Sequence, residues 1–384
     1  MTRAWSRPFL MISLAFLAFG TSVPVHAGYG PRAYMDLHPP GWLSSKAVCV
    51  NDRGAVAGYG TTVAGERGFI WSGGKHTTLL PPGAVSCTVS WMNSRGDVAG
   101  TALDAEGTPH AFLFHNGGYV DPTPGWKYSE ALYVGEDGAV TGSGELGGFV
   151  ALDGRIDIPP TFAAVVGRTS TGVLLGYGDN SVRVFVPGKG YLTLLPPGGD
   201  SASPGRMNEK GLVTFSSASQ GVEMGYVYSK VDSEYGGFMI FMTPPSWSSS
   251  RAESINNRSE VVGYGDSPQG RKGYLRSGTE YEEIACPGWS TTEAESVNDL
   301  GQVAGSGVDG SGETHAFLSS PASLSAASGD PGNEASASAG GGCSMTPAGT
   351  EPVSASGVCS LLLLLSPMAY PFARSLQRRA ISRR

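Results

Sequence analysis

A short segment that recurs seven times constrains the fold of this 384-residue chain more than any other feature of the sequence. The segment reads NDRGAVAG at its first occurrence, and its copies follow at intervals of 42, 42, 34, 39, 48 and 42 residues. The seven copies begin at Asn51, Asn93, Gly135, Thr169, Asn208, Asn256 and Asn298. A period near forty residues is typical of proteins that repeat one supersecondary unit. The fold must therefore consist of seven similar units.

Two further elements accompany each copy of the segment. An aromatic residue follows in segments such as GFIW and HAFLF, at Phe69, Phe112, Phe149, Phe185, Tyr226, Tyr274 and Phe317. A proline-rich segment such as HPPGW or CPGW then separates one unit from the next. We interpret each unit as a strand, a turn that begins at the Asn, a second strand, a hairpin, the aromatic strand, a Gly turn and a short last strand. Strand pairing should stop between units, because proline cannot donate a ladder hydrogen bond.

This pattern predicts an all-β repeat fold, a seven-bladed β-propeller over residues 28–319. Propeller blades have four strands and number roughly four to eight. The segment YMDL at residues 34–37 resembles the last strand of a unit, and we expect it to complete the seventh blade. The alternative is a β-solenoid, in which the same repeats stack into an elongated array.

The repeated residues have structural interpretations. The aliphatic residue two places after the turn glycine, such as Val56, should fill the blade interior, and Gly58 and Gly60 should let neighbouring sheets approach closely. The Asn that begins each turn suits a tight turn, because its side chain bonds to backbone two residues further on.

The alternation of the Asn turn with HAF-type strands resembles the extracellular HAF repeat family, across residues 34–318. The sequences at 110–112 and 315–317 are literal His-Ala-Phe copies, whereas units four and five depart most from the pattern. The resemblance implies secretion and a β-rich repeat fold. The family is associated with no defined reaction.

The N-terminal 27 residues have the layout of a secretory signal peptide. Arg3 and Arg7 precede an apolar run from Phe9 to Phe19, and a polar region ends at the small residue Ala27. We expect export and cleavage after Ala27, since the apolar run is short for a membrane span.

The C-terminal end also resembles a processing signal. Residues 320–342 are rich in Ser, Ala and Gly and predict a flexible linker. Residues 343–384 begin at Cys343 and continue into a leucine run and five arginines, which resembles the Myxo-CTERM and JDVT-CTERM sorting signals of Gram-negative bacteria. The resemblance implies cutting by a sorting protease at Cys343, display on the outer cell surface, and membrane contact only through the tail. The alternative is a plain C-terminal membrane anchor.

The composition of residues 28–319 excludes one class of partner. This region has 19 Lys and Arg against 30 Asp and Glu, a formal charge of −11, which argues against nucleic-acid binding. Its cysteines, Cys49, Cys87 and Cys286, could form one disulfide but lack a zinc-binding spacing. We predict no metal or other cofactor. The hairpins at Asp104 and Asp309 are the best calcium candidates, although solvated turns explain them too.

The sequence identifies no catalytic residues. It contains no G-x-S-x-G, H-E-x-x-H or Walker motif. We therefore expect a monomeric binding module for a glycan or protein partner, with a polysaccharide hydrolase or lyase that uses the propeller channel as the alternative. The candidate partner-binding residues occupy equivalent loops: Trp42, Trp126, Trp247 and Trp289. Such tryptophans can anchor a ligand, or each can cover the end of its own blade.

Overall fold

The computed structural model describes residues 31–229 and 237–325. Within these ranges the chain forms seven four-stranded antiparallel sheets and one short helix, α1 (Ala322–Ser325). Among the same residues, no helix is long and apolar enough to cross a membrane. The predicted signal peptide with Ala27, residues 326–342 of the predicted linker, and the tail with Cys343 lie outside the described residues.

The first four sheets follow the chain in order. Blade 1 contains β2 (Lys46–Val50), β3 (Val56–Thr62), β4 (Gly65–Ser72) and β5 (Lys75–Leu79). Blade 2 contains β6 (Ser86–Met92), β7 (Val98–Leu103), β8 (Pro109–His115) and β9 (Gly118–Val120). Blade 3 contains β10 (Ser129–Val134), β11 (Val140–Gly144), β12 (Gly147–Leu152) and β13 (Arg155–Asp157). Blade 4 contains β14 (Ala164–Arg168), β15 (Leu174–Gly178), β16 (Ser181–Val186) and β17 (Gly190–Leu194).

The last three sheets complete the set, and the seventh takes its outer strand from the other end of the chain. Blade 5 contains β18 (Ser201–Met207), β19 (Val213–Ser219), β20 (Val222–Ser229) and β21 (Phe238–Phe241). Blade 6 contains β22 (Arg251–Ile255), β23 (Val261–Ser267), β24 (Gly270–Ser277) and β25 (Glu280–Ile284). Blade 7 contains β26 (Glu293–Val297), β27 (Val303–Val308), β28 (Thr314–Pro321) and β1 (Arg32–Asp36).

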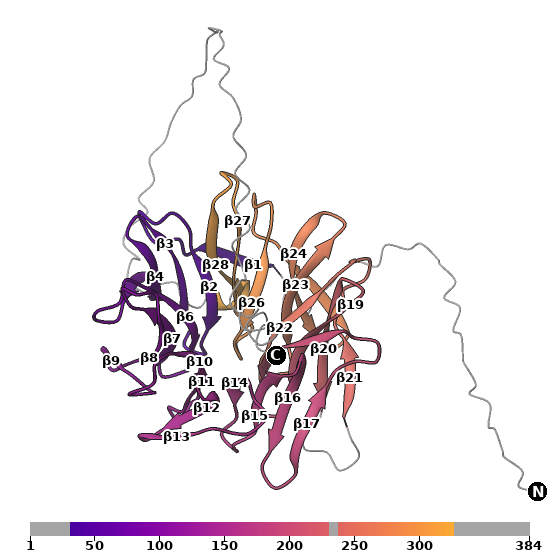
Figure 1. The fold of residues 1–384 in the computed structure, drawn as a ribbon. Coiled ribbons are helices and arrows are strands. Elements are labelled where there is room, and N and C mark those ends of the chain that lie inside the picture. The colour runs from indigo at the N-terminus through magenta and orange to yellow at the C-terminus, as the bar shows by residue number, and fades with distance from the viewer. Residues whose placement is uncertain (1–30, 230–236, 326–384) are drawn as a thin grey trace, which may run out of the picture. The chain divides into compact units, whose positions relative to one another are not determined.

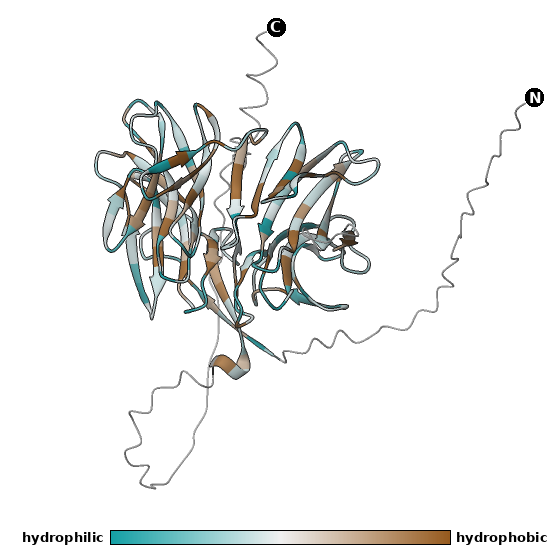
Figure 2. Cartoon of the chain, turned by 90° about the horizontal axis from the view of Figure 1, so that it is seen from below, coloured by the Kyte–Doolittle hydropathy of each residue, from teal (hydrophilic) through white to brown (hydrophobic). Residues whose placement is uncertain are grey.

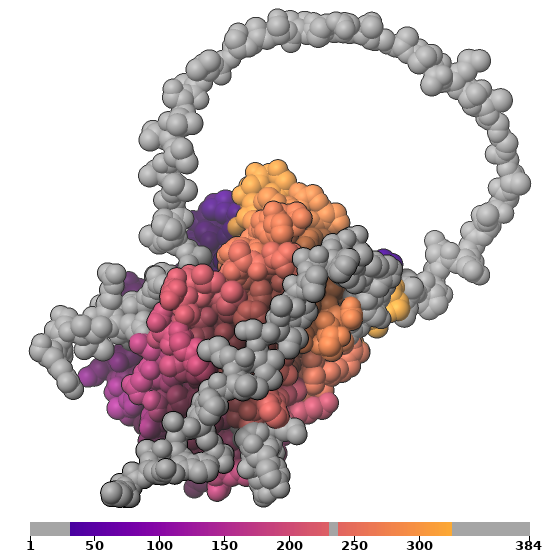
Figure 3. All heavy atoms as spheres, turned by 90° about the vertical axis from the view of Figure 1, so that its right-hand side faces the viewer, coloured from indigo at the N-terminus to yellow at the C-terminus, as the bar shows by residue number. Residues whose placement is uncertain are grey.

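The seven sheets form a closed ring around one axis (Figure 1). The first strand of each blade contacts the first strand of the next, and β26 of blade 7 contacts β2 of blade 1. Each blade also packs on the next through that first strand. Figure 3 shows the blades following one another in chain order, from magenta through orange to yellow. The structure is therefore the seven-bladed β-propeller that the repeats predict, and it is not a solenoid.

The N-terminal strand β1 closes the ring, as the YMDL segment predicted. It pairs antiparallel with β28, from Arg32 opposite Pro321 to Asp36 opposite Phe317. The Arg32 side chain is almost fully buried and donates to the carbonyl oxygens of Gly301 and Ser319, at 2.7 and 3.1 Å. Blade 7 is thus built from both ends of the described chain.

The core of each blade forms where the repeat places its apolar residues. The valines and the leucine that follow the turn begin the second strand of each sheet and are buried: Val56, Val98, Val140, Leu174, Val213, Val261 and Val303. The repeated aromatic residues lie on the third strands. Hydrophobic residues recur on the strands of every sheet (Figure 2). This distribution confirms the predicted burial of the aliphatic position and the predicted third strand for the aromatic position.

The glycines of the repeat are required within a blade, which corrects the prediction that they let neighbouring sheets approach closely. A Cβ atom at Gly58 would collide with the carbonyl oxygen of Lys46 in the same sheet and lie 2.8 Å from the Phe69 ring. A Cβ atom at Gly60 would collide with the carbonyl oxygen of Ser44. The glycines therefore make room for the blade's own aromatic ring and inner strand.

The Asn turns connect the blades as well as shaping them. Within its turn, Asn51 Oδ1 accepts hydrogen bonds from the backbone of Arg53 and Ala55, at 3.1 and 3.0 Å. Its Nδ2 donates to the carbonyl oxygen of Asn93 in the next blade, at 3.1 Å. Equivalent bonds lead from the side chains of Asn93, Asn208, Asn256 and Asn298 to the next blade's turn, the last of them closing on Asn51.

The two units that lack this Asn use other contacts. Gly135 has no side chain, and an ion pair from Arg168 to Asp137 bridges blades 3 and 4 instead. Between blades 4 and 5, the backbone and hydroxyl of Ser170 donate to Glu209, at 2.9 and 2.7 Å. Every interface between blades in the described chain is thus tied at the turn.

Candidate functional site

The first strand of every blade carries an irregularity that leaves one residue, or two in blade 5, out of the regular ladder. The pairing of the first and second strands shifts register at one point in each blade. The residues at these points are Val48, Ser90, Leu132, Val166, Gly205 with Arg206, Glu253 and Glu295. A β-bulge re-aims side chains and is common near functional sites. Because first strands surround the axis, these bulges decide what occupies it.

Arg206 reaches across the axis from blade 5. Its guanidinium donates to the carbonyl oxygens of Val166 at 2.9 Å and Ser90 at 3.1 Å, in blades 4 and 2. It also stacks on the ring of Trp91, 4.4 Å from the ring centre. A polymer could pass through the axis at this level only by breaking these contacts.

Carboxylates gather on the axial side of blades 6 and 7. Burial, together with the nearby charges of Glu253 and Glu293, raises the pKa of Glu295 to about 8. The positive charges of Arg251 and Lys46 oppose that rise. Glu295 is therefore largely protonated at neutral pH, and this side of the axis is acidic.

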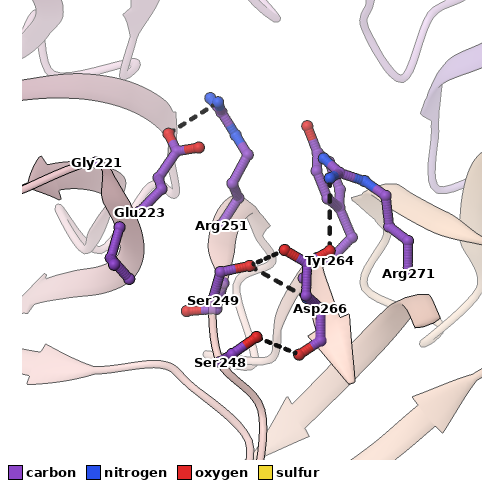
Figure 4. A pocket seen from close by; sticks show the side chains of 11 residues that line it. Gly221, Glu223, Ser248, Ser249, Arg251, Tyr264, Asp266 and Arg271 are labelled. Carbon is purple, nitrogen blue, oxygen red and sulfur yellow. Dashed lines mark hydrogen bonds and ion pairs between the residues drawn. The ribbon is translucent and has the colours of Figure 1, made fainter. Parts of the chain in front are cut away.

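A polar pocket of about 370 Å³ lies beside these residues, between blades 5 and 6. Glu223 lines it from β20, and Arg251, Asp266 and Arg271 line it from β22, β23 and β24 of blade 6 (Figure 4). The loop at Ser248 and Ser249 completes the wall. Two arginines and two carboxylates thus share one small site.

Ion pairs hold both arginines in place. Arg251 bonds to Glu223 at 2.9 Å and to Glu253 at 2.6 Å, so it joins the pocket to the axial carboxylates. Arg271 bonds to Glu293 of blade 7 at 2.5 Å and lies 3.8 Å from Asp266. Burial lowers the pKa of Arg271, but the carboxylate of Glu293 and other nearby anionic groups raise it more, so the guanidinium stays charged.

An aromatic ring and hydroxyl groups fix the remaining geometry of the pocket. Tyr264 is buried, and the guanidinium carbons of Arg271 and Arg251 lie 4.7 and 6.0 Å from its ring centre. The Ser249 hydroxyl donates to Asp266 Oδ2 at 2.7 Å, which orients that carboxylate (Figure 4). The pocket therefore presents oriented donors and acceptors with no formal net charge among its four charged lining residues.

The predicted tryptophans lie elsewhere, each half-buried on the aromatic residue of its own blade. Edge-to-face contacts join Trp42 to Phe69, Trp126 to Phe149, Trp247 to Tyr274 and Trp289 to Phe317, at 5.8, 5.5, 5.9 and 6.0 Å between ring centres. These contacts agree with the alternative that each tryptophan covers its own blade. The structure does not bring the four together into one site, and their role in partner binding stays a prediction.

The two calcium candidates cap their own hairpins. Asp104 Oδ1 accepts from the backbone of Glu106 and Thr108, and Asp309 Oδ1 accepts from the backbone of Ser311 and Glu313. No cluster of three or more His, Cys, Asp or Glu residues suited to a metal occurs in the part of the chain that the structure describes. The cysteines Cys49, Cys87 and Cys286 are all free and buried.

The pocket residues escaped the sequence analysis because no motif links them. They come from two blades and from strand ends whose spacing differs among the repeats. One usable signal exists, because Arg251, Glu253, Glu293 and Glu295 stand where other first strands carry mostly uncharged residues. Aligning the first strands of the seven units would have exposed this charged cluster.

Comparison with known proteins yields fold-level likeness at low identity. No family profile matches the sequence, and no curated protein matches it. Among solved structures, PorZ, a surface component of the type-IX secretion system of Porphyromonas gingivalis, is 12% identical with a TM-score of 0.38. That match covers 68% of this chain and 49% of PorZ, so the chain spans about half the length of that protein.

Two further structures illustrate the range of these matches. YCF48 bound to D1 peptide is 12% identical with a TM-score of 0.46, covering 76% of this chain and 97% of that one. A fucoside-bound lectin of Aleuria aurantia is 11% identical with a TM-score of 0.35, covering 64% and 96%. A fold does not imply a function, because function depends on the residues of a particular site.

Proposed function

We propose that this protein is a binding module whose polar pocket between blades 5 and 6 takes a hydroxyl-rich ligand, a glycan. The observation that carries the proposal is the alternation of Arg251 and Arg271 with Glu223 and Asp266 around one pocket. A sugar hydroxyl both accepts from a guanidinium and donates to a carboxylate. A neutral polyol therefore satisfies both kinds of group without burying an unpaired charge.

Preorganisation strengthens this proposal. Arg251, Arg271 and Asp266 are each held by a partner before any ligand arrives. Such side chains lose little conformational entropy on binding, and this loss is a main cost of recognition. Charge-assisted hydrogen bonds are also about twice as strong as neutral ones.

A glycan array probed with the purified protein tests the proposal. We expect one glycan class to bind wild type, and Arg271→Ala or Asp266→Asn to weaken it roughly tenfold, because a hydrogen bond to a charged group contributes about 1.5–3 kcal/mol. Glu145→Gln is the matched control, since Glu145 follows Gly144 in blade 3 as Asp266 follows Gly265 in blade 6. Absence of any bound glycan, or equal weakening by the control, would refute the site.

The axial carboxylates favour one second candidate, a polysaccharide hydrolase or lyase. The pKa of about 8 makes Glu295 a proton donor at neutral pH, beside other carboxylates that include Glu253. A proton donor paired with a carboxylate is the arrangement that glycosidases use. Release of reducing or unsaturated ends from bound polysaccharide would support catalysis, and its loss in Glu295→Gln would assign it. Binding of polysaccharide without release of product would support the binding module over the enzyme.

We also propose that the propeller is a secreted HAF-repeat protein displayed on the bacterial cell surface. This rests on the signal-peptide pattern ending at Ala27 and on the sorting-type tail beginning at Cys343. The intact mass of protein recovered from its native host tests both cuts. A mass that includes residues 1–27 or Arg384 would contradict the corresponding step.

A further inference from the structure

Four of the seven blades fill one position with an aromatic ring from the loop before the first strand. These rings belong to Trp42, Trp126, Trp247 and Trp289. Each packs edge-to-face on the third-strand aromatic residue of its own blade, as the contacts above show. In blade 4 the loop ring, Phe162, lies elsewhere, against Gly176, as Phe69 lies against Gly58 in blade 1. The position therefore accommodates a planar ring in four blades.

Blade 5 has a different arrangement. Its loop carries Gly199 at this position, and its second strand carries Phe215 where most blades have glycine. Phe215 is fully buried and stacks on Tyr226, with 5.2 Å between ring centres. In this blade the ring that packs on the third-strand aromatic residue therefore comes from the second strand.

Blade 2 has neither a loop ring nor a second-strand ring, and a pocket lies at the ring position. Its loop carries Ala84 and its second strand carries Gly100 at the two positions in question. A pocket of about 320 Å³ opens over Phe112 and Tyr119, with Pro81 and Pro82 in its wall. The ring position of blade 2 is therefore a pocket.

Blade 7 shows how a ring would fit, because blades 2 and 7 share the His-Ala-Phe sequence. There Trp289 stands edge-to-face against Phe317, at 6.0 Å and 86°, and against His315, at 6.1 Å and 85°. Blade 2 offers the equivalent residues Phe112 and His110, and both line the pocket. Blade 2 therefore has the residues that contact the tryptophan in blade 7 but has no tryptophan between them.

The rim of this pocket is acidic. Asp104 and Asp121 both line it, and His110 lies against Asp104 with 3.1 Å between Nε2 and Oδ2. The backbone of Thr108 and neighbouring groups lower the pKa of Asp104, so it is ionised at neutral pH. The floor, in contrast, is apolar and includes Ala102, Leu103 and Phe112. The pocket thus combines an apolar slot for a ring, lined by Ala84, Ala102 and Phe112, with a negatively charged edge.

We propose that the blade 2 pocket binds an aromatic side chain of a peptide or protein partner, with a Lys or Arg beside that residue in the partner sequence. An indole satisfies the edge-to-face geometry seen in blade 7, whereas a sugar lacks the aromatic edge and face. The basic neighbour meets Asp104 and Asp121. This site lies apart from the pocket between blades 5 and 6 and does not depend on the function proposed for it.

The test fills the slot with a ring from the chain itself. In blades 3 and 7 the residue beneath the tryptophan is glycine, since a Cβ atom at Gly144 or Gly307 would lie 2.6 or 2.8 Å from the indole. Blade 2 has Ala102 at this position. The double variant Ala84→Trp with Ala102→Gly therefore reproduces the blade 3 pair and should melt no lower than wild type.

Capped Lys-Trp-Lys is the probe, with Lys-Ala-Lys and Glu-Trp-Glu as control peptides, and binding is followed by protein NMR on the full chain. We expect Lys-Trp-Lys to shift the resonances of Ala84, Ala102, His110 and Tyr119. The double variant should bind it at least tenfold more weakly, Glu-Trp-Glu should bind wild type more weakly, and Lys-Ala-Lys should leave these resonances unmoved.

Three results would overturn the proposal. The first is wild-type protein in which Lys-Trp-Lys leaves these four resonances unmoved, a result that needs no variant to fold. The second is a folded double variant that binds the peptide as well as wild type does. The third is equal binding of Lys-Ala-Lys, which would show attraction to the negative surface without a ring slot.

Discussion

The Asn turn at the closure between blades 7 and 1 allows a quantitative test of the ring. Asn298 is buried, and its Nδ2 donates to the Asn51 carbonyl oxygen and to Gln302 Oε1, both at 2.8 Å. Its Oδ1 accepts from the backbone of Leu300 and Gln302, at 3.1 and 2.9 Å. Replacement by alanine removes all four bonds and leaves the buried Asn51 carbonyl without this donor.

The expected cost of Asn298→Ala is about 3 kcal/mol in the free energy of unfolding, since each buried hydrogen bond contributes about 0.5–1.5 kcal/mol and an unsatisfied group costs more. Equilibrium urea unfolding measures it as a shift in midpoint. Thr169→Ala is the matched control, because the two bonds of that hydroxyl, from the Val173 backbone at 3.1 Å and with the Thr171 hydroxyl at 2.9 Å, lie within its own turn and should cost about 1–2 kcal/mol. Equal effects of the two substitutions would refute the inter-blade role of the Asn.

Three further predictions concern closure, titration and thiol chemistry. Deleting residues 31–38 removes β1 and buried Leu37 and should lower the melting temperature by about 10 °C; an unchanged transition would exclude closure by β1. Native Glu295 keeps a proton that the unfolded chain releases above about pH 4.5. The free energy of unfolding of wild type, measured relative to Glu295→Gln, should therefore fall as pH rises from about 4.5 to 8. A constant difference across that range would contradict the raised pKa. Burial raises the pKa of Cys49 and Cys286 to about 12, and Cys87 is buried as well. A thiol reagent should therefore label these three cysteines only after unfolding, and rapid labelling of any of them at neutral pH would show that its thiol is accessible.

The repeat made the architecture predictable, because seven copies of one pattern leave few arrangements. The turn at Asn51, the buried Val56 and the aromatic strand at Phe69 depend mainly on residues within one unit. Even the closing strand could be identified, since residues 34–37 resemble a unit's last strand. Local pattern and fold agree at these positions.

Contacts between units could not be predicted from one copy of the repeat. The Asn51 side chain donates to a carbonyl oxygen 42 residues away, so its inter-blade bond does not follow from the sequence of one turn. The prediction for Gly58 was wrong in the opposite sense, because the ring that it accommodates, Phe69, comes from the third strand of its own blade.

The candidate site was hidden for the same reason. Arg251 pairs with Glu223 of blade 5, and Arg271 pairs with Glu293 of blade 7. These contacts form only when the blades are arranged in the ring, and no residue spacing in the sequence predicts them. The tryptophans were the residues that the sequence predicted for partner binding, because they share a loop position, but each packs into a separate blade.

Hydrogen–deuterium exchange of the protein with its best-binding glycan tests whether the ligand lies in the pocket between blades 5 and 6. We predict slower exchange on ligand addition at residues 248–251 and 264–271, which form the pocket wall in blade 6. The corresponding segments of blade 3, residues 127–130 and 143–148, should be unchanged. Protection that appears in blade 3 or only at the tryptophan loops, with none at 248–251 and 264–271, would contradict the assignment of the binding site.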